Sequence, residues 1–236
     1  MPDSISLTRR VAHECACSYA EAEQIIADGG VSIDGNVVTD PQRMVGDERI
    51  QIDPAMRPEA IEPATMLLNK PAGVAVADAV ELIQPETRWA DDPSGVRMLP
   101  RHFKRLTPLM PLDTEASGLI VLSQDGRVWR QLTEDARELE QEYVVEVRGD
   151  AGPYALGRLA RGITYNGREL PPCKVSWQNE VRLRFAIHDV QPGQLRHMCG
   201  AVGFEVVAIR RIRIGRVPLR KLPLGEWCAL PAGERF

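Results

Sequence analysis

Apolar residues in the first 52 positions follow a helical spacing and then a strand spacing. Residues 7–11 predict a short helix, and Ser18 with Glu21 forms a capping-box signal for a second helix, which a Gly-Gly pair ends. Apolar pairs on both sides of the Asp-Gly-Asn segment at 34–36 predict a β-hairpin, and residues 49–52 predict a further strand. The pattern is typical of a small domain with two helices and a short sheet.

Three prolines among residues 54–63 mark a change of composition along the chain. Proline disfavours both a continuous helix and an inner strand, so this segment predicts a linker. We expect a domain boundary within it, with a small domain at residues 1–59 and a larger one at residues 60–236.

The larger domain is predicted to contain long strands that do not alternate regularly with helices. This order favours an α+β fold over a doubly wound parallel sheet. Residues 85–108 show little periodicity and predict long loops. The expected strands are 66–69, 118–122, 142–147, 174–177, 181–187 and 205–209, and the expected helices are 127–134, 154–159 and 194–202.

Composition narrows the class of protein. No apolar run approaches the roughly 18 residues of a membrane span, and no basic-then-apolar signal segment opens the sequence, so we expect a cytoplasmic protein without membrane association. The five cysteines lack a C-x-x-C frame and the four histidines lack ligand spacing, which argues against a disulfide scaffold and a metal site. The sequence also has no glycine-rich phosphate loop that would indicate a nucleotide cofactor.

Charge is unevenly distributed along the sequence. The net charge is -4, yet residues 1–59 hold 5 Lys/Arg against 11 Asp/Glu, and residues 60–236 hold 24 against 22. Residues 194–221 hold seven Lys/Arg and one acid. Because phosphate contact leaves a basic footprint, this C-terminal segment is the expected surface for a nucleic-acid partner, with a solvated charged face as the alternative.

Two residues far apart in the sequence indicate chemistry when taken together. Asp113 stands in a loop that leads into the apolar strand at 118–122, and Arg196 follows 83 positions later. A carboxylate kept ionised by a buried arginine in a dry pocket suits attack on carbon. Taken singly, each residue also has an ordinary explanation, Asp113 as a turn aspartate and Arg196 as a surface arginine.

Four segments together resemble the RsuA family of bacterial ribosomal-RNA pseudouridine synthases, and most resemble its large-subunit-modifying branch. They are LNKPAGV at 68–74, LDTEASGL at 112–119, QLR at 194–196, and RIRIG at 211–215 with LPLGEW at 222–227. The two helices and the VSIDG hairpin of the small domain resemble the S4-like RNA-binding domain of these enzymes. The resemblance implies an α+β protein, with a small N-terminal RNA-binding domain and a pseudouridine-synthase-like catalytic domain with a long, mostly antiparallel sheet.

The resemblance also implies roles for individual residues. Asp113 matches the catalytic aspartate, Arg196 the arginine that pairs with it, and Tyr143 the tyrosine that stacks on the target base, although a tyrosine in an alternating strand is otherwise a core residue. Lys70 is expected at the pocket mouth or on a phosphate, with ordinary packing as the alternative. The remaining expected substrate-binding residues are Leu112 and Leu195 as apolar walls, and Arg210, Arg211 and Arg213.

Several cations of the family pattern are replaced in this sequence. The arginine before the Leu-Asp pair is Pro111, the lysine two places before the tyrosine is Gln141, and the arginine that opens the R-Q-I-R motif is Gly193. The Thr or Ser three places after the aspartate is Ala116. Either the lost RNA contacts are replaced by other basic residues, namely Arg101, Lys104 or Arg105, or catalysis is weak.

The sequence therefore predicts a monomeric pseudouridine synthase that isomerises one uridine of ribosomal RNA, in the large subunit, without a metal or a small-molecule cofactor. Such an enzyme breaks the bond between ribose and N1 of a flipped uracil, rotates the base and rejoins it through C5. The alternative hypothesis is a catalytically weak or inactive RNA- or ribosome-binding protein that keeps the synthase fold.

Overall fold

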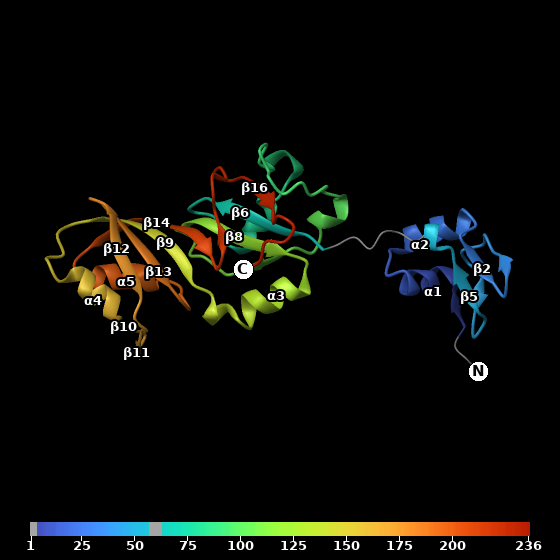
Figure 1. The fold of residues 1–236 in the computed structure, drawn as a ribbon, viewed down its shortest axis with the longest axis horizontal. Coiled ribbons are helices and arrows are strands. Elements are labelled where there is room, and N and C mark those ends of the chain that lie inside the picture. The colour runs from blue at the N-terminus through green and yellow to red at the C-terminus, as the bar shows by residue number, and fades with distance from the viewer. Residues whose placement is uncertain (1–3, 57–62) are drawn as a thin grey trace. The chain divides into compact units, whose positions relative to one another are not determined.

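The computed structural model describes residues 4–56 and 63–236. The chain divides into two compact units, Met1–Glu62 and Pro63–Phe236, and Figure 1 labels the main helices and strands of each. The predicted boundary between residues 59 and 60 lies outside the described residues. Within the described residues, every helix is too short or too polar to cross a membrane.

The first unit packs two helices and two small sheets around one apolar core. Ser18 caps the second helix, because its hydroxyl accepts a hydrogen bond from the Glu21 amide while the Glu21 carboxylate accepts one from the Ser18 amide, which confirms the predicted capping box. Asp34 and Gly35, with φ of 50° and 87°, form the hairpin turn, so Asn36 belongs to the following strand. The elements are β1 (Ile5–Ser6), α1 (Leu7–Glu14), α2 (Tyr19–Ala27), β2 (Val31–Ile33), β3 (Asn36–Val37), β4 (Met44–Val45), β5 (Ile50–Ile52) and η1 (Pro54–Met56).

The second unit is built on a nine-stranded sheet in the order β12-β13-β9-β14-β8-β6-β16, with β15 beside β14 and β7 beside β8. The β14–β8 pair is parallel and the other named pairs are antiparallel, so the sheet is mostly antiparallel, as predicted. The strands are β6 (Thr65–Lys70), β7 (Thr107–Leu109), β8 (Ser117–Ser123), β9 (Gln141–Arg148), β12 (Lys174–Asn179), β13 (Arg182–Ile187), β14 (Glu205–Ile214), β15 (Val217–Pro218) and β16 (Trp227–Ala229).

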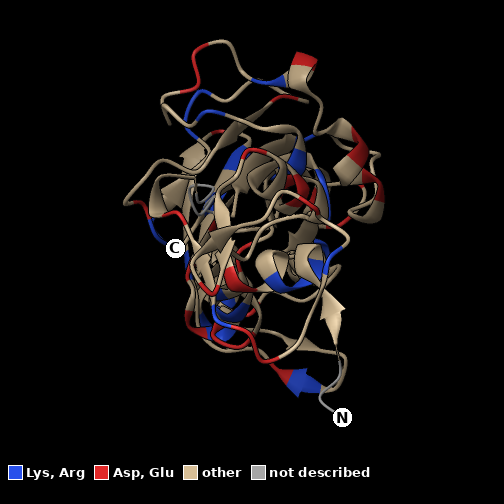
Figure 2. Ribbon diagram, turned by 90° about the vertical axis from the view of Figure 1, so that its right-hand side faces the viewer, with Lys and Arg blue, Asp and Glu red and all other residues tan. Residues whose placement is uncertain are grey.

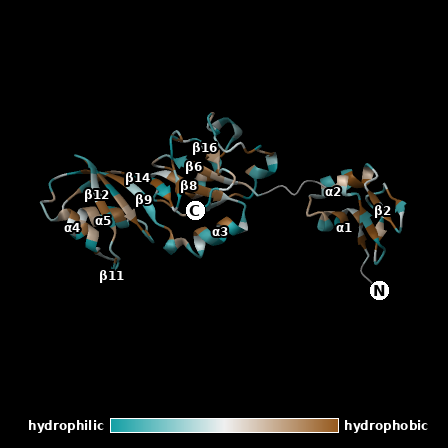
Figure 3. Cartoon of the chain, viewed as in Figure 1, coloured by the Kyte–Doolittle hydropathy of each residue, from teal (hydrophilic) through white to brown (hydrophobic). Residues whose placement is uncertain are grey.

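Both faces of the middle of this sheet are buried. Ile120 and Leu122 of β8 face one core, whereas Leu119 and Val121 face the other, which explains why this strand is continuously apolar. Figure 3 shows the central strands mostly hydrophobic, and α3 hydrophilic on one side and hydrophobic on the other. Helices α4 (Ala155–Arg161) and α5 (Gln194–Ala201) pack on the first core, and α3 (Gly126–Thr133) packs on the second.

The predicted strands and helices of this unit are all present, with shifted ends. The strand predicted at 205–209 runs on to Ile214, because the charged RIR segment that broke the apolar pattern continues the pairing with β9. The region 85–108 contains short turns and one short strand. Elements too short for a periodic signal were missed, namely η2 (Ala77–Leu82), η3 (Pro85–Thr87), η4 (Pro100–Phe103), η5 (Ala136–Glu138), β7, β15, β16, and the hairpin of β10 (Thr164–Tyr165) with β11 (Arg168–Glu169).

Gly118 allows β8 and β14 to approach closely where they pair in parallel. Its φ is 110°, and a Cβ atom on it would lie 2.2 Å from the Arg211 carbonyl oxygen and 2.7 Å from the Arg211 amide nitrogen. Real side chains do not tolerate such contacts with backbone atoms. Only glycine therefore fits at this position, directly after the Asp113 loop.

Substitution of Gly118 by alanine should destabilise the protein by about 2–5 kcal/mol, since it adds an unfavourable φ to a backbone clash. Urea unfolding followed by circular dichroism measures the change. The matched control is Gly126→Ala, because a Cβ atom there meets open space at the start of α3. Equal unfolding midpoints for the two variants would contradict the close approach.

Candidate active site

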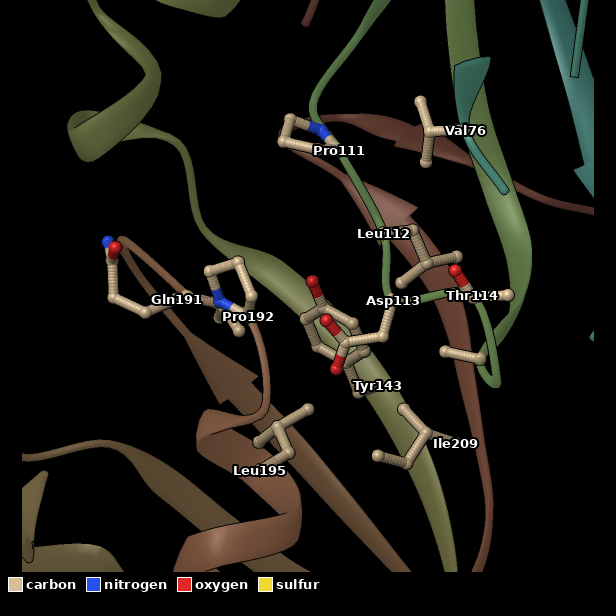
Figure 4. A pocket seen from close by; sticks show the side chains of 12 residues that line it. Val76, Pro111, Leu112, Asp113, Thr114, Tyr143, Gln191, Pro192, Leu195 and Ile209 are labelled. Carbon is tan, nitrogen blue, oxygen red and sulfur yellow. The ribbon is translucent and has the colours of Figure 1, made fainter. Parts of the chain in front are cut away.

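A cavity of about 350 Å³ opens beside the sheet on the face that carries α5 (Figure 4). Leu112 and Leu195 are buried and form apolar walls of this cavity, which is where the sequence predicted them. None of its lining residues is a lysine or an arginine. They are Val76, Pro111, Leu112, Asp113, Thr114, Ala116, Tyr143, Val190, Gln191, Pro192, Leu195 and Ile209.

Asp113 lies at the centre of this lining, on the loop between β7 and β8. Its backbone carbonyl accepts a hydrogen bond from Ala116, which closes a turn before β8. The Oδ2 atom accepts a hydrogen bond of 3.0 Å from the Gly193 amide at the start of α5. Within the described residues Oδ1 has no such donor, so one carboxylate oxygen is held and the other faces the cavity.

Arg211 lies behind the Asp113 loop and is 1% exposed. Its guanidinium donates to the carbonyl oxygens of Leu119 at 2.7 Å, Pro111 at 3.2 Å and Met110 at 2.5 Å, and to Gln141 Oε1 at 3.1 Å. Two of these carbonyls belong to the Asp113 loop itself. The prediction that Arg211 contacts RNA is therefore wrong. Arg211 is a buried residue that holds the Asp113 loop through these carbonyls, and we call this arrangement the clamp.

Tyr143 forms the floor of the cavity with a side chain that is 2% exposed. Its hydroxyl donates to Gln141 Oε1 at 2.8 Å, the same atom that Arg211 binds. Burial raises the pKa of the Tyr143 hydroxyl, and the Arg211 cation opposes this effect. Tyr143 and Asp113 project into the same space in Figure 4, as the sequence predicted.

Lys70 does not lie at the cavity mouth and is fully buried. Its ammonium donates to the carbonyl oxygens of Pro71 at 2.9 Å, Val74 at 2.7 Å and Thr114 at 3.0 Å. Burial lowers the pKa of Lys70, while the Glu115 carboxylate opposes this. All three N–H donors of the ammonium are occupied, so the predicted phosphate contact is wrong. Lys70 instead links the 71–74 loop to the Asp113 loop.

Arg196 does not form the predicted ion pair with Asp113. Its side chain is exposed, and its Nη1 atom donates to the Val206 carbonyl at 3.0 Å. Leu195, Met198 and Cys199 form the buried face of α5, and Arg196 lies outside that face. The sequence motif indicated that α5 meets the aspartate, but the contact is made by a backbone amide.

Arg213 and Arg210 also lie away from the cavity. A shift in register between β14 and β9 places Arg213 on the face opposite Arg211, where it donates to Glu140 Oε1 at 2.6 Å and Glu142 Oε1 at 2.8 Å. Arg210 is exposed and points away from the face of Ile209. Figure 2 shows acidic and basic residues interspersed along the ribbon. Within the predicted basic segment, Arg213 is neutralised by its ion pairs with Glu140 and Glu142.

The residues whose hydrogen bonds hold Asp113 and Tyr143 were not predicted as site residues. Gln141 and Gly193 stood out in the sequence only as positions where a family cation is missing, and the structure places them as partners of Tyr143 and Asp113. The suggested substitutes Arg101, Lys104 and Arg105 do not line the cavity. Within residues 4–56 and 63–236, no three His, Cys, Asp or Glu side chains are placed to hold a metal ion.

Comparison with known families identifies the family of the larger unit. The profile of the RNA pseudouridylate synthase family matches residues 64–195, which is more than half of the chain. The chain belongs to this family. The synthase domain follows an S4 domain, whose profile matches residues 11–49.

Several relatives match this synthase over nearly its whole length. The "Ribosomal large subunit pseudouridine synthase B" of Bacillus subtilis is 29% identical over 232 residues, with 93% of this chain and 89% of the relative covered. The "Dual-specificity RNA pseudouridine synthase RluF" of Escherichia coli K12 is 26% identical, with 99% and 78% covered. A solved pseudouridylate synthase structure has a TM-score of 0.61 at 22% identity, with 96% of both chains covered, and supports the fold.

Replacing Arg211 by methionine should destabilise the protein by about 3–5 kcal/mol, because the buried carbonyls of Met110 and Leu119 and the partly buried carbonyl of Pro111 lose their donor. Urea unfolding measures the difference. Arg210→Met is the matched control on the same strand, and its exposed side chain predicts a change within about 0.5 kcal/mol. A small effect for both variants would show that the clamp does not stabilise the loop.

The Arg213 network predicts a pH-dependent contribution to stability. Hydrogen bonds from Arg213 lower the pKa of Glu140, and they lower that of Glu142 against the opposing effect of burial. Because these two pKa values are lower in the folded state than the ordinary value of 4.5, the ionised carboxylates stabilise the folded state above pH 4.5. This stabilisation is lost as the pH falls and the carboxylates become protonated. Arg213→Met should therefore be about 1 kcal/mol less stable than the wild type at pH 6.

The stability difference should shrink as the pH falls from 6 to 3. Urea midpoints measured across this range for Arg213→Met, Arg210→Met and the wild type give the comparison. Arg210→Met should show no pH-dependent difference. A constant gap for Arg213→Met would mean that packing, not charge, accounts for its effect.

Proposed function

We propose that this synthase isomerises a uridine of large-subunit ribosomal RNA to pseudouridine. The observation that carries the proposal is that Asp113 and Tyr143 come from separate elements to line one apolar cavity in a chain of this family. The large-subunit substrate rests on the name of the Bacillus subtilis relative. The S4 match adds a second RNA-binding element to the same chain.

The proposed reaction needs a carboxylate beside the target nucleotide and no net transfer of electrons. The bond from ribose C1′ to uracil N1 breaks, the base rotates, and a bond from C1′ to C5 forms as the C5 proton is lost and N1 gains one. We assign the attacking carboxylate to Asp113, with Oδ1 as the reacting oxygen because Oδ2 is held by Gly193. The bond that Oδ1 forms to the nucleotide breaks again before the product leaves, which regenerates the carboxylate. No redox cofactor is required by this balance.

Tyr143 is proposed to stack on the flipped uracil. Stacking of a base on an aromatic ring contributes about 1–3 kcal/mol, which helps offset the cost of unstacking the nucleotide. Leu112, Leu195 and Ile209 supply the apolar walls that exclude water around the base. We further propose that the protein acts as a cytoplasmic monomer without a metal or cofactor.

Asp113→Asn should abolish isomerisation and leave RNA affinity within a few-fold, since the amide keeps the shape of the side chain but loses its nucleophilic charge. The measurement is the mapping of pseudouridine in ribosomal RNA from cells with the gene, without it, and with each variant. Asp91→Asn, at an exposed position, is the matched control and should restore the modification.

The possible results separate the site from the function. A ribosomal RNA position that loses pseudouridine without the gene and regains it with Asp113→Asn would refute the assignment of Asp113. Identical maps with and without the gene, despite RNA binding by the purified protein, would favour the inactive binding protein instead.

A further inference from the structure

The peptide group between Pro192 and Gly193 is held at both ends. Tyr165 donates its hydroxyl to the Pro192 carbonyl at 2.6 Å, and the Gly193 amide donates to Asp113 Oδ2 at 3.0 Å. Because a peptide group is planar and its C=O and N–H point in opposite directions, fixing the oxygen also aims the amide. Tyr165 is thus connected to Asp113 through a single rigid unit.

Hydrogen bonds also hold the residues on either side of this peptide: the Gln191 amide donates to Gln194 Oε1 at 3.0 Å, and the Gly193 carbonyl accepts from the His197 amide at 3.0 Å. The bonds from Tyr165 and to Asp113 are those made by the peptide's own oxygen and N–H. The peptide lies on the loop from β13 to α5, where Gln191 and Pro192 are exposed and Pro192 has no N–H to donate. Gly193 has a φ of 73°, and a Cβ atom on it would meet the Tyr165 hydroxyl at 3.0 Å. The glycine therefore fits both the left-handed conformation and the close approach of the tyrosine.

The Tyr165 side chain is itself held in place. Its ring packs against the His197 ring with 5.0 Å between centroids, and His197 Nε2 lies 3.0 Å from the Thr164 carbonyl oxygen. These contacts join strand β10 to α5 without the tyrosine hydroxyl. Removing only the hydroxyl should leave the ring and the hairpin in place.

We propose that Tyr165 is a positioning residue for the Asp113 carboxylate, acting through the Pro192–Gly193 peptide. A hydrogen bond to the peptide oxygen polarises the group and strengthens its N–H as a donor to the carboxylate. The amide stands at the N-terminal end of α5, where the helix dipole also favours a negative charge. This inference rests on the proposed role of Asp113, and it assigns to a backbone amide the support that the sequence had assigned to Arg196.

The kinetic test is Tyr165→Phe in the full-length protein, with Tyr154→Phe as the matched control because Tyr154 is 79% exposed. Tyr165→Phe should lower kcat about tenfold, the effect of one weakened hydrogen bond, and leave KM for RNA within about twofold. Tyr154→Phe should match the wild type in both constants. A kcat of Tyr165→Phe equal to that of the wild type would overturn the proposal. If KM were raised while kcat stayed unchanged, the hairpin would bind RNA instead, and the proposal would also fail.

A second measurement does not depend on turnover. Pro192 and Gly193 form the only Pro-Gly pair in the sequence, so labelling with ¹³C-carbonyl proline and ¹⁵N-glycine selects the Gly193 amide in NMR spectra. Its proton resonance should shift upfield in both Tyr165→Phe and Asp113→Ala, and stay unchanged in Tyr154→Phe. A resonance that Tyr165→Phe leaves in place would overturn the relay even if the synthase were active.

The two measurements also separate this inference from the proposed function. If the wild type modified no RNA, but the Gly193 resonance shifted as expected in Tyr165→Phe and Asp113→Ala, the Tyr165 relay would stand and the proposed reaction would fail. An active wild type with unmoved resonance and unchanged kcat in Tyr165→Phe would retain the reaction and lose the relay.

Discussion

The buried guanidinium of Arg211 is the interaction on which the geometry of the site depends. It reaches the carbonyls of Met110 and Pro111 on the loop that presents Asp113, the carbonyl of Leu119 on β8, and the Gln141 side chain on β9. A buried cation is costly unless its donors are satisfied, so the surrounding backbone is constrained to meet it. The carbonyls of the Asp113 loop and the Gln141 side chain, which also binds the Tyr143 hydroxyl, meet that requirement.

The sheet around Arg211 is adapted to the same constraint. Gly118 lets β8 lie against β14 at the arginine itself, and the register shift beyond it turns Arg213 to the opposite face. Met110 adopts a φ of 54° beside its clamped carbonyl. The Asp113 loop is therefore held by a strand that contributes only Ile209 to the cavity lining.

Local motifs predicted those parts of the molecule that short-range physics determines. The capping box of α2, the apolar strand β8 and the segment around Asp113 could be read from neighbouring residues. Arg196 could not, since its direction depends on which face of α5 packs on the sheet. Arg211 and Arg213 looked alike in sequence, and only the register between β14 and β9 separates a buried clamp from a surface ion pair.

Lys70 and Arg211 are both buried cations, and both donate mainly to backbone carbonyls. They are nevertheless not interchangeable. The three oxygens around Lys70 converge on one nitrogen, which suits a compact ammonium. The acceptors of Arg211 are spread over three segments, which suits a planar, forked group. Among the described residues, the interior therefore distinguishes these two cations by shape. The single nitrogen of a lysine cannot reach acceptors spread over three segments, and three oxygens that converge on one nitrogen do not match the fork of an arginine.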